Sequence, residues 1–124
     1  MKGKREMIKG IGIDLIELDR ISRIIKKKPR FVQRILTERE RETYKKITSN
    51  QRKREYIAGR YAAKEAFAKA AGVGIGRLSF QHIEVLSNEK GAPVLTAKGY
   101  EKNTIFISIT HSKDFAAAQV VIAD

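Results

Sequence analysis

The order of its predicted secondary structure most strongly constrains how this chain of 124 residues can fold. Residues 8–16 (IKGIGIDLI) are apolar, β-branched and marked by glycines, a pattern that predicts a buried strand. Helical patterns come next, and strand patterns occupy most of the remainder. The longest helical segment is rich in alanine, so it can pack closely on a sheet. We therefore expect an α+β fold with an antiparallel sheet packed against a long helix.

Local signals set the predicted bounds. Thr37 and Glu40 form a capping box, and Gly72 ends the longest helix, which Ser49 or Asn50 caps. The predicted helices are 17–28, 31–36, 37–47 and 51–71, with a short helix at 97–102. After a loop at 72–76, the predicted strands are 79–86, 94–96, 105–110 and 116–122, with a turn at 88–91. Within the last strand, residues 117–122 (AAQVVI) offer either an apolar edge for a subunit contact or an inner strand.

Composition limits the class of protein. Hydrophobic residues make up 42% of the chain, as in globular proteins, and no apolar run is long enough to cross a bilayer. The polar, basic start lacks the apolar stretch of a signal peptide, so we expect a cytoplasmic protein. The absence of cysteine excludes disulfides, thiol nucleophiles and zinc–thiolate sites.

The charge balance points to an anionic partner. The net charge is +12, which attracts nucleic acid, anionic membranes, phosphorylated cofactors and acidic proteins alike. Arg20, Arg23 and Lys27 share one helix face, opposite much of an isoleucine stripe. This face is either a docking surface for an acidic helix or a solvated surface. The full basic series comprises Arg20, Arg23, Lys26, Lys27, Arg30 and Arg34.

Asp14 is a carboxylate within an apolar strand. Strand alternation places Gly12, Asp14 and Ile16 on one face. A carboxylate there needs a metal or a hydrogen-bond donor, and Gly12 leaves space for a ligand's phosphate. Alternatively, Asp14 caps the helix that follows.

Glu65 is a second candidate ligand, beside the buried stripe of the long helix, which is predicted to comprise Ile57, Tyr61, Ala68 and Ala71. Two half-buried carboxylates from separate elements suit Mg²⁺, which completes its octahedron with water and substrate phosphates. Alternatively, Glu65 forms an ion pair with Lys69 four residues on, on a solvated face.

The segment SITHSKD (108–114) follows an apolar strand and is rich in donors. Thr110, His111, Ser112 and Lys113 can all donate to a phosphate. A Ser-His-Asp triad is a weaker interpretation, since adjacent residues on an extended chain point apart. A third interpretation is an ordinary polar turn between two strands.

These segments together resemble the small bacterial phosphopantetheinyl transferases of the holo-acyl-carrier-protein synthase family. The matching stretches are GIGIDLIELDRI (10–21), FVQRILTERE (31–40), AGRYAAKEAFAKAAGVGIG (58–76), LSFQHIEV (78–85), GAPVL (91–95) and ISITHSKDFAAAQVVI (107–122). They cover nearly the whole chain in the family's order. Residues 1–6 fall outside them, as a basic extension before a single domain over 7–124.

The resemblance implies a reaction and an assembly. Members of the family transfer phosphopantetheine from coenzyme A to a serine of an acyl carrier protein, in fatty acid biosynthesis, and release adenosine 3',5'-bisphosphate. A homotrimer with active sites between subunits is implied, with no nucleic acid or membrane as partner. By resemblance, Asp14 and Glu65 are catalytic and ligate Mg²⁺, while Lys64 contacts phosphate.

The same resemblance assigns the remaining site residues. His111 lies near the adenosine end of coenzyme A, reached from a neighbouring subunit, with Ser112 and Lys113 as further donors. The docking positions for the carrier protein are Arg20, Ile24, Arg30 and Arg34. Larger members of the superfamily carry another carboxylate two residues after the first. Here that position is Ile16, so we expect water to fill that coordination site.

Two other functions fit parts of the sequence. A basic nucleic-acid-binding module explains the charge but not the carboxylates in buried elements, and its binding would depend steeply on salt. A partner protein without catalysis, docking through residues 20–34, explains the basic face alone. Binding of coenzyme A separates the enzyme from both.

Overall fold

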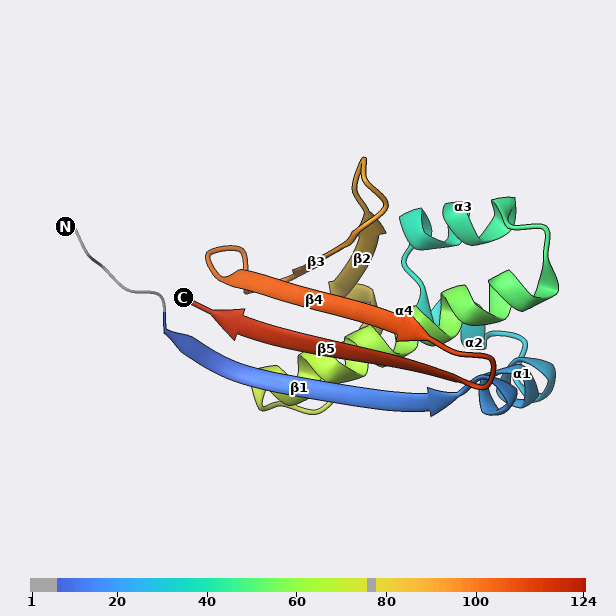
Figure 1. Ribbon diagram of the computed structural model, residues 1–124, viewed down its shortest axis with the longest axis horizontal. Coiled ribbons are helices and arrows are strands. Elements are labelled where there is room, and N and C mark those ends of the chain that lie inside the picture. The colour runs from blue at the N-terminus through green and yellow to red at the C-terminus, as the bar shows by residue number, and fades with distance from the viewer. Residues whose placement is uncertain (1–6, 76–77) are drawn as a thin grey trace.

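The computed structural model describes residues 7–75 and 78–124. The predicted extension at 1–6 and Gly76 of the predicted loop lie outside them. Three antiparallel strands, β1 (Ile8–Glu17), β5 (Phe115–Ala123) and β4 (Thr104–His111), form a sheet in the order β1-β5-β4, and the helix α4 (Asn50–Ala71) lies along one face (Figure 1). The predicted α+β fold, with an antiparallel sheet against a long helix, is confirmed.

The other elements gather at one end and one edge of this unit (Figure 1). The helices α1 (Leu18–Lys27), α2 (Phe31–Ile35) and α3 (Glu38–Lys46) lie near the start of α4. The short helix η1 (Phe80–His82) leads into a separate two-stranded antiparallel sheet of β2 (Ile83–Ser87) and β3 (Pro93–Ala97).

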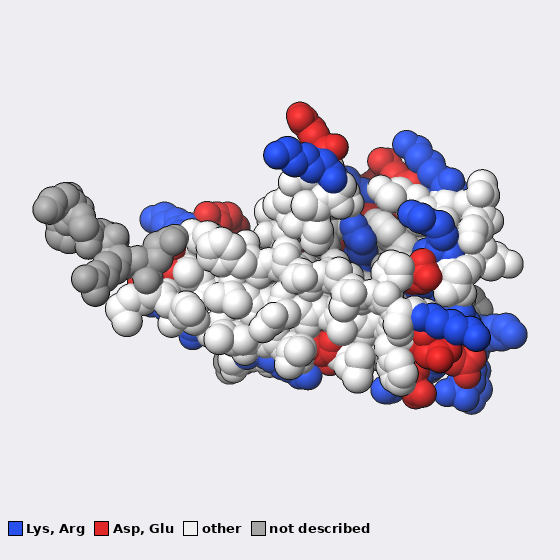
Figure 2. Space-filling model, viewed as in Figure 1, with Lys and Arg blue, Asp and Glu red and all other residues white. Residues whose placement is uncertain are grey.

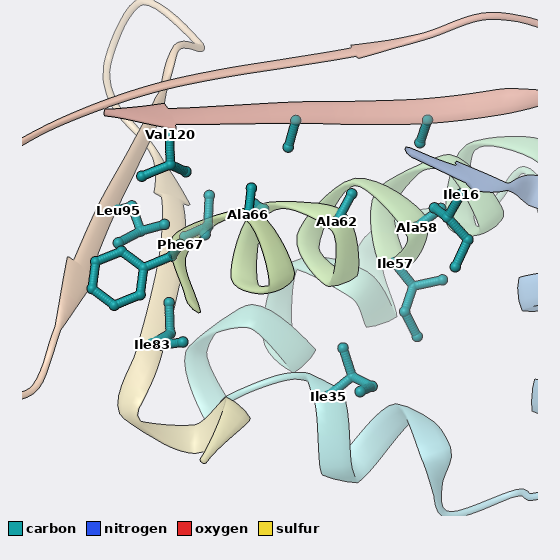
Figure 3. Close-up of a cluster of buried hydrophobic side chains, with 14 of the residues drawn as sticks. Ile16, Ile35, Ile57, Ala58, Ala62, Ala66, Phe67, Ile83, Leu95 and Val120 are labelled. Atoms are coloured by element: carbon teal, nitrogen blue, oxygen red, sulfur yellow. The ribbon is translucent and has the colours of Figure 1, made fainter. Parts of the chain in front are cut away.

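The core lies between α4 and the sheet. Figure 3 shows Ala58, Ala62 and Ala66 of α4 close to the strands, while Phe67 points away toward Ile83 and Leu95. Small side chains on this helix let it approach the sheet closely. Of the predicted stripe on α4, Ile57 and Ala68 are buried, and Tyr61 and Ala71 are half-buried.

Strand β1 alternates as predicted. Ile11, Ile13 and Leu15 face outward and are 58%, 62% and 64% exposed, whereas Gly12 and Ile16 are buried on the α4 side. The predicted open space beside Gly12 is wrong, because α4 fills it. A Cβ on Gly12 would lie 1.9 Å from the carbonyl oxygen of Ala66, so only glycine permits this contact.

Most predicted helix ends are confirmed. Thr37 and Glu40 form the capping box, and Ser49 caps α4 by accepting a hydrogen bond from the backbone of Arg52. Gly72 ends α4 in the left-handed conformation, with φ of 75°. The predicted helix at 97–102 is wrong: the segment forms turns around Gly99, whose φ is 90°.

Strand β5 lies in the middle of its sheet, so residues 117–122 form an inner strand and not an edge. Within residues 7–75 and 78–124, every helix is too short or too polar to span a bilayer.

Candidate active site

Asp14 points from β1 toward α4, where it meets a lysine. The Nζ of Lys69 donates to Asp14 Oδ1 over 3.2 Å and to the carbonyl oxygen of Ile13 over 2.9 Å. The Asp14 side chain is only 16% exposed. The alternative that Asp14 caps a helix is wrong, because α1 begins at Leu18 and its capping position is Glu17.

Glu65 lies within electrostatic reach of Asp14. Burial raises the pKa of Glu65, the charge of Asp14 raises it further, and Lys69 lowers it. The alternative, an ion pair between Glu65 and Lys69, does not form, because the ammonium of Lys69 is bonded to Asp14. Two carboxylates that repel each other in a half-buried site provide hard oxygen donors for a divalent cation.

The carboxylates fit Mg²⁺ as a partial ligand set. In the described part of the chain, no three His, Cys, Asp or Glu residues are grouped so as to hold a metal. Mg²⁺ is commonly held by one or two protein carboxylates, with water and substrate phosphates completing the shell. Asp14 and Glu65 would therefore hold the cation only together with a phosphate ligand.

A groove of about 310 Å³ begins at Glu65. Its walls include a row of aromatic rings, in which Tyr61 lies between Phe31 and Phe80, with centroid separations of 6.0 and 5.7 Å. We call it the aromatic groove; its lining residues are Ile24, Lys27, Lys28, Phe31, Arg34, Ile35, Tyr61, Glu65, Ile75 and Phe80. A carboxylate thus lies beside an apolar channel that has cations on its rim.

Three of the four predicted docking residues surround this groove. Ile24 and Arg34 line it. Arg20 is exposed and close enough to act on Tyr61, whose pKa is raised by burial and by Glu65 and lowered by Arg20. Arg30 is exposed at the start of α2. The structure therefore places the predicted docking face next to Glu65.

Lys64 is not at this site. Its side chain is fully buried, and its ammonium donates to Glu40 Oε1 and to the carbonyl oxygen of Ile35, each over 2.7 Å, and to that of Phe80 over 3.1 Å. The predicted contact with phosphate does not fit this location, since all three N–H groups are used inside the protein. Lys69 is the lysine that faces the two carboxylates.

His111 lines a second hollow, at the end of β4. Its Nδ1 lies 3.6 Å from Glu55 Oε2. We call this hollow of about 290 Å³ the histidine pocket; its lining residues are Ile47, Arg52, Glu55, Tyr56, Gly59, Arg60, Ser87, Gly91, Pro93, Ile109 and His111. It shares no lining residue with the aromatic groove. Within one chain, His111 is therefore not brought to Glu65.

Arg52 and Arg60 give the histidine pocket a cationic wall that the sequence did not reveal. The Arg60 guanidinium lies 4.1 Å from the centroid of the Tyr56 ring, and its Nε donates to the carbonyl oxygen of Val85. Nothing in the local pattern relates these arginines to His111, since the pocket unites α4, the β2–β3 turn and β4.

Ser112 and Lys113 lie beyond His111 in an exposed turn. The Ser112 hydroxyl accepts a hydrogen bond from the backbone of Phe115, and Lys113 lines a recess with Asp19 and Arg54. The acidic group beside His111 is Glu55, so a Ser112-His111-Asp114 triad does not form.

The chain is similar to proteins of one family along nearly its whole length. The sequence profile of the 4'-phosphopantetheinyl transferase superfamily matches residues 10–121. A holo-[acyl-carrier-protein] synthase of Oceanobacillus iheyensis is 54% identical over 116 residues, covering 94% of this chain and 97% of that protein. One of Bacillus velezensis is 54% identical over 119 residues, covering 94% and 96%.

Two solved structures are also similar. A holo-(acyl-carrier-protein) synthase from Bacillus anthracis, in complex with CoA (3',5'-ADP), has a TM-score of 0.87 and 47% identity and covers 95% of this chain and 98% of that one. The corresponding protein of Helicobacter pylori, in complex with coenzyme A, has a TM-score of 0.79 and 37% identity, with coverage of 90% and 98%.

Proposed function

The chain belongs to the holo-[acyl-carrier-protein] synthases of the 4'-phosphopantetheinyl transferase superfamily, and from this we propose its reaction. The serine hydroxyl of an apo acyl carrier protein attacks the phosphorus of coenzyme A that carries the pantetheine. A serine–phosphate bond forms, the bond to the bridging oxygen breaks, and adenosine 3',5'-bisphosphate leaves. The serine proton is released.

The observation that carries this proposal is the position of Glu65. It interacts electrostatically with Asp14 and also lines the aromatic groove, so a diphosphate held at the carboxylates has an apolar channel beside it for a pantetheine arm. A phosphate-binding site without such a channel would suit a simple nucleotide equally well. The juxtaposition favours a substrate with a charged half and a long uncharged half.

Asp14 and Glu65 would hold Mg²⁺, which neutralises charge on the diphosphate when bound. Lys69, whose ammonium faces Asp14, would donate to a phosphate oxygen of the substrate. This assignment moves the phosphate contact from Lys64 to Lys69, because Lys69 is 55% exposed and Lys64 is fully buried.

The histidine pocket is the proposed site for the adenosine half of coenzyme A. Arg52 and Arg60 supply positive charge, and His111 a further donor, for its 3'-phosphate, while Ile109 and Pro93 offer apolar surface for the base. Ser112 and Lys113, in the exposed turn beyond His111, stay as proposed further donors to coenzyme A. The carrier protein would dock on the basic face of Arg20, Ile24, Arg30 and Arg34, beside the groove mouth.

A homotrimer would unite the two halves of the site. The outer face of the main sheet is uncharged over a wide area in Figure 2 and exposes Ile11, Ile13, Leu15 and Phe106. A contiguous apolar face of this kind is typical of a subunit interface. The histidine pocket of one subunit would then lie beside the carboxylates and groove of its neighbour.

Mass spectrometry of the carrier tests the reaction directly. The purified protein is incubated with apo acyl carrier protein, coenzyme A and MgCl₂, and we expect the carrier to gain the mass of one phosphopantetheine while adenosine 3',5'-bisphosphate appears. A carrier whose acceptor serine is replaced by alanine should gain nothing. Asp14→Asn should lower the rate at least about 100-fold with its melting temperature unchanged. An unmodified carrier would refute the proposal.

A further inference from the structure

Lys64 and Glu40 form an ion pair that the proposed reaction does not use. Both side chains are fully buried. The Lys64 ammonium has three acceptors: one oxygen of Glu40 and the backbone carbonyls of Ile35 and Phe80. A lysine has three N–H donors, so the group is completely satisfied inside the protein.

Glu40 adds two further hydrogen bonds to those of Lys64. Its Oε1 also accepts from the backbone N–H of Thr37 over 2.8 Å, and its Oε2 accepts from that of Val85 over 2.6 Å. Two side chains therefore tie α4 to the end of α2, the start of α3, η1 and β2. Apart from the local bond between Thr37 and Glu40, these hydrogen bonds join residues that are 16 to 45 positions apart in the sequence.

The network ends on the walls of the aromatic groove. Ile35 and Phe80, whose carbonyls accept from Lys64, line that groove together with Glu65. Lys64 and Glu65 are adjacent on α4, so their side chains leave the helix about 100° apart. One residue thus anchors two groove walls while the next presents its carboxylate to the groove.

Stability alone does not account for such a pair. Both charges are removed from water, and the cost of this desolvation offsets much of their attraction. Replacing buried ion pairs by neutral groups is often harmless to stability, whereas removing one partner is not. The pair instead fixes the relative positions of the segments, because its hydrogen bonds determine which backbone groups lie beside Lys64 and Glu40.

We propose that Lys64 and Glu40 are positioning residues: their buried ion pair holds the Ile35 and Phe80 walls of the aromatic groove in register with Glu65. The inference rests on the proposed function, since the groove is taken to receive the pantetheine arm. Loss of the pair would shift the walls relative to the carboxylate and slow transfer, with little effect on the histidine pocket.

Three variants separate positioning from stability. Lys64→Met leaves Glu40 buried without its cation and should lower the melting temperature. Adding Glu40→Gln to it removes the uncompensated charge, so the double variant should regain part of that loss. The remainder persists because one carboxylate oxygen becomes an NH₂ that cannot accept from the backbone. The kcat of the double variant should nevertheless stay 10- to 100-fold below the parent, as expected for misplacement of about an ångström. Lys9→Met, which breaks an exposed ion pair with Asp124, is the charge-matched control for Lys64→Met and should behave as the parent.

Two further readouts distinguish this proposal from the proposed function. Adenosine 3',5'-bisphosphate lacks the pantetheine arm, so its Kd should change less than twofold in the double variant. Hydrogen exchange should accelerate in 31–37 and 78–85 but not in β1 or β5, and this holds even if the parent transfers nothing. Turnover that recovers together with the melting temperature, or unchanged exchange in both segments, would overturn the positioning role.

Discussion

Glu65 occupies a position that is unfavourable for the protein without a bound cation. Burial and the neighbouring Asp14 both raise its pKa, and Lys69 compensates only in part. A carboxylate in this situation is destabilising when ionised and is relieved by a proton or a cation. The free energy of unfolding should therefore report on this residue directly, without any assay of turnover.

Glu65→Gln should raise the melting temperature in a chelator at neutral pH. The pKa of Glu65 is higher in the folded than in the unfolded chain, so its favourable contribution is complete below the unfolded value near 4.5 and is lost as pH rises through the folded value. The advantage of the variant should shrink as pH falls toward 4.5. Because Glu65 is only half-buried, solvent screens its charge and the effect should be small.

Magnesium provides the control for that measurement. Added MgCl₂ should stabilise the parent by binding the folded form, and should stabilise Glu65→Gln much less. A variant that melts below the parent in chelator at neutral pH would contradict the assignment of Glu65 as an electrostatically strained ligand.

The sequence predicted residues whose roles depend on neighbours along the chain. Asp14 was recognisable because a carboxylate is unusual in an apolar strand, and Glu40 because a capping box is local. The partner of Glu40 was not, since Lys64 reaches it only after α3 has packed on α4. Arg52 and Arg60 were missed for the same reason. The prediction for Gly12 was wrong because the space beside it is occupied by α4 and not by a ligand.

At the scale of elements, two contacts set the site. β1 and α4 approach each other backbone to backbone at Gly10 and Gly12, which brings Asp14 toward Glu65. On the other side of α4, α1 and α2 form the rim and part of the wall of the aromatic groove. The first contact therefore fixes the carboxylates, and the second presents the basic face.

Gly12→Ala should destabilise the protein by about 1–3 kcal/mol, since the new methyl would meet the backbone of Ala66, which cannot rotate away. Denaturation in urea measures the change. Gly74→Ala is the matched control, because nothing lies within 4 Å of a Cβ there. Equal midpoints for the two variants would mean that β1 can move off α4 freely.

Arg20→Glu on α1 should raise the KM for the carrier protein about tenfold and leave that for coenzyme A within twofold. Reversing one charge on a docking face weakens attraction to an acidic partner, and added salt should mimic the change in the parent. Steady-state kinetics with each substrate varied measures both. Lys102→Glu makes the same charge change in an exposed turn that lines neither the histidine pocket nor the aromatic groove, and it should alter neither KM. Equal effects on the two substrates would argue against a dedicated docking face.

At the scale of the whole molecule, the two halves of the proposed site are separate. The carboxylates and aromatic groove involve β1, α1, α2 and α4, whereas His111 lies at the end of β4 in another pocket. The apolar outer face of the sheet carries exposed side chains from both β1 and β4. Pairing of that face between chains would bring the halves together.

Mixing two inactive variants tests the shared site. Glu65→Ala and His111→Ala should each be nearly inactive, but trimers that exchange subunits will contain interfaces in which both residues are intact. Activity should partly return on mixing, and light scattering should report about three chains per particle. A particle of one chain, with no recovery after subunit exchange, would exclude the assembly.

The central place of β5 also has a consequence for how the chain is made. Among the strands of the described residues, β1 and β4 are each hydrogen-bonded only to β5. β1 emerges first from the ribosome, yet its partner is synthesised roughly 5–20 s later at ordinary translation rates. Until then β1 can pack against the helices α4 and α1. The three-stranded sheet therefore cannot form until β5 has been synthesised, and we expect a nascent chain halted before residue 115 to lack it.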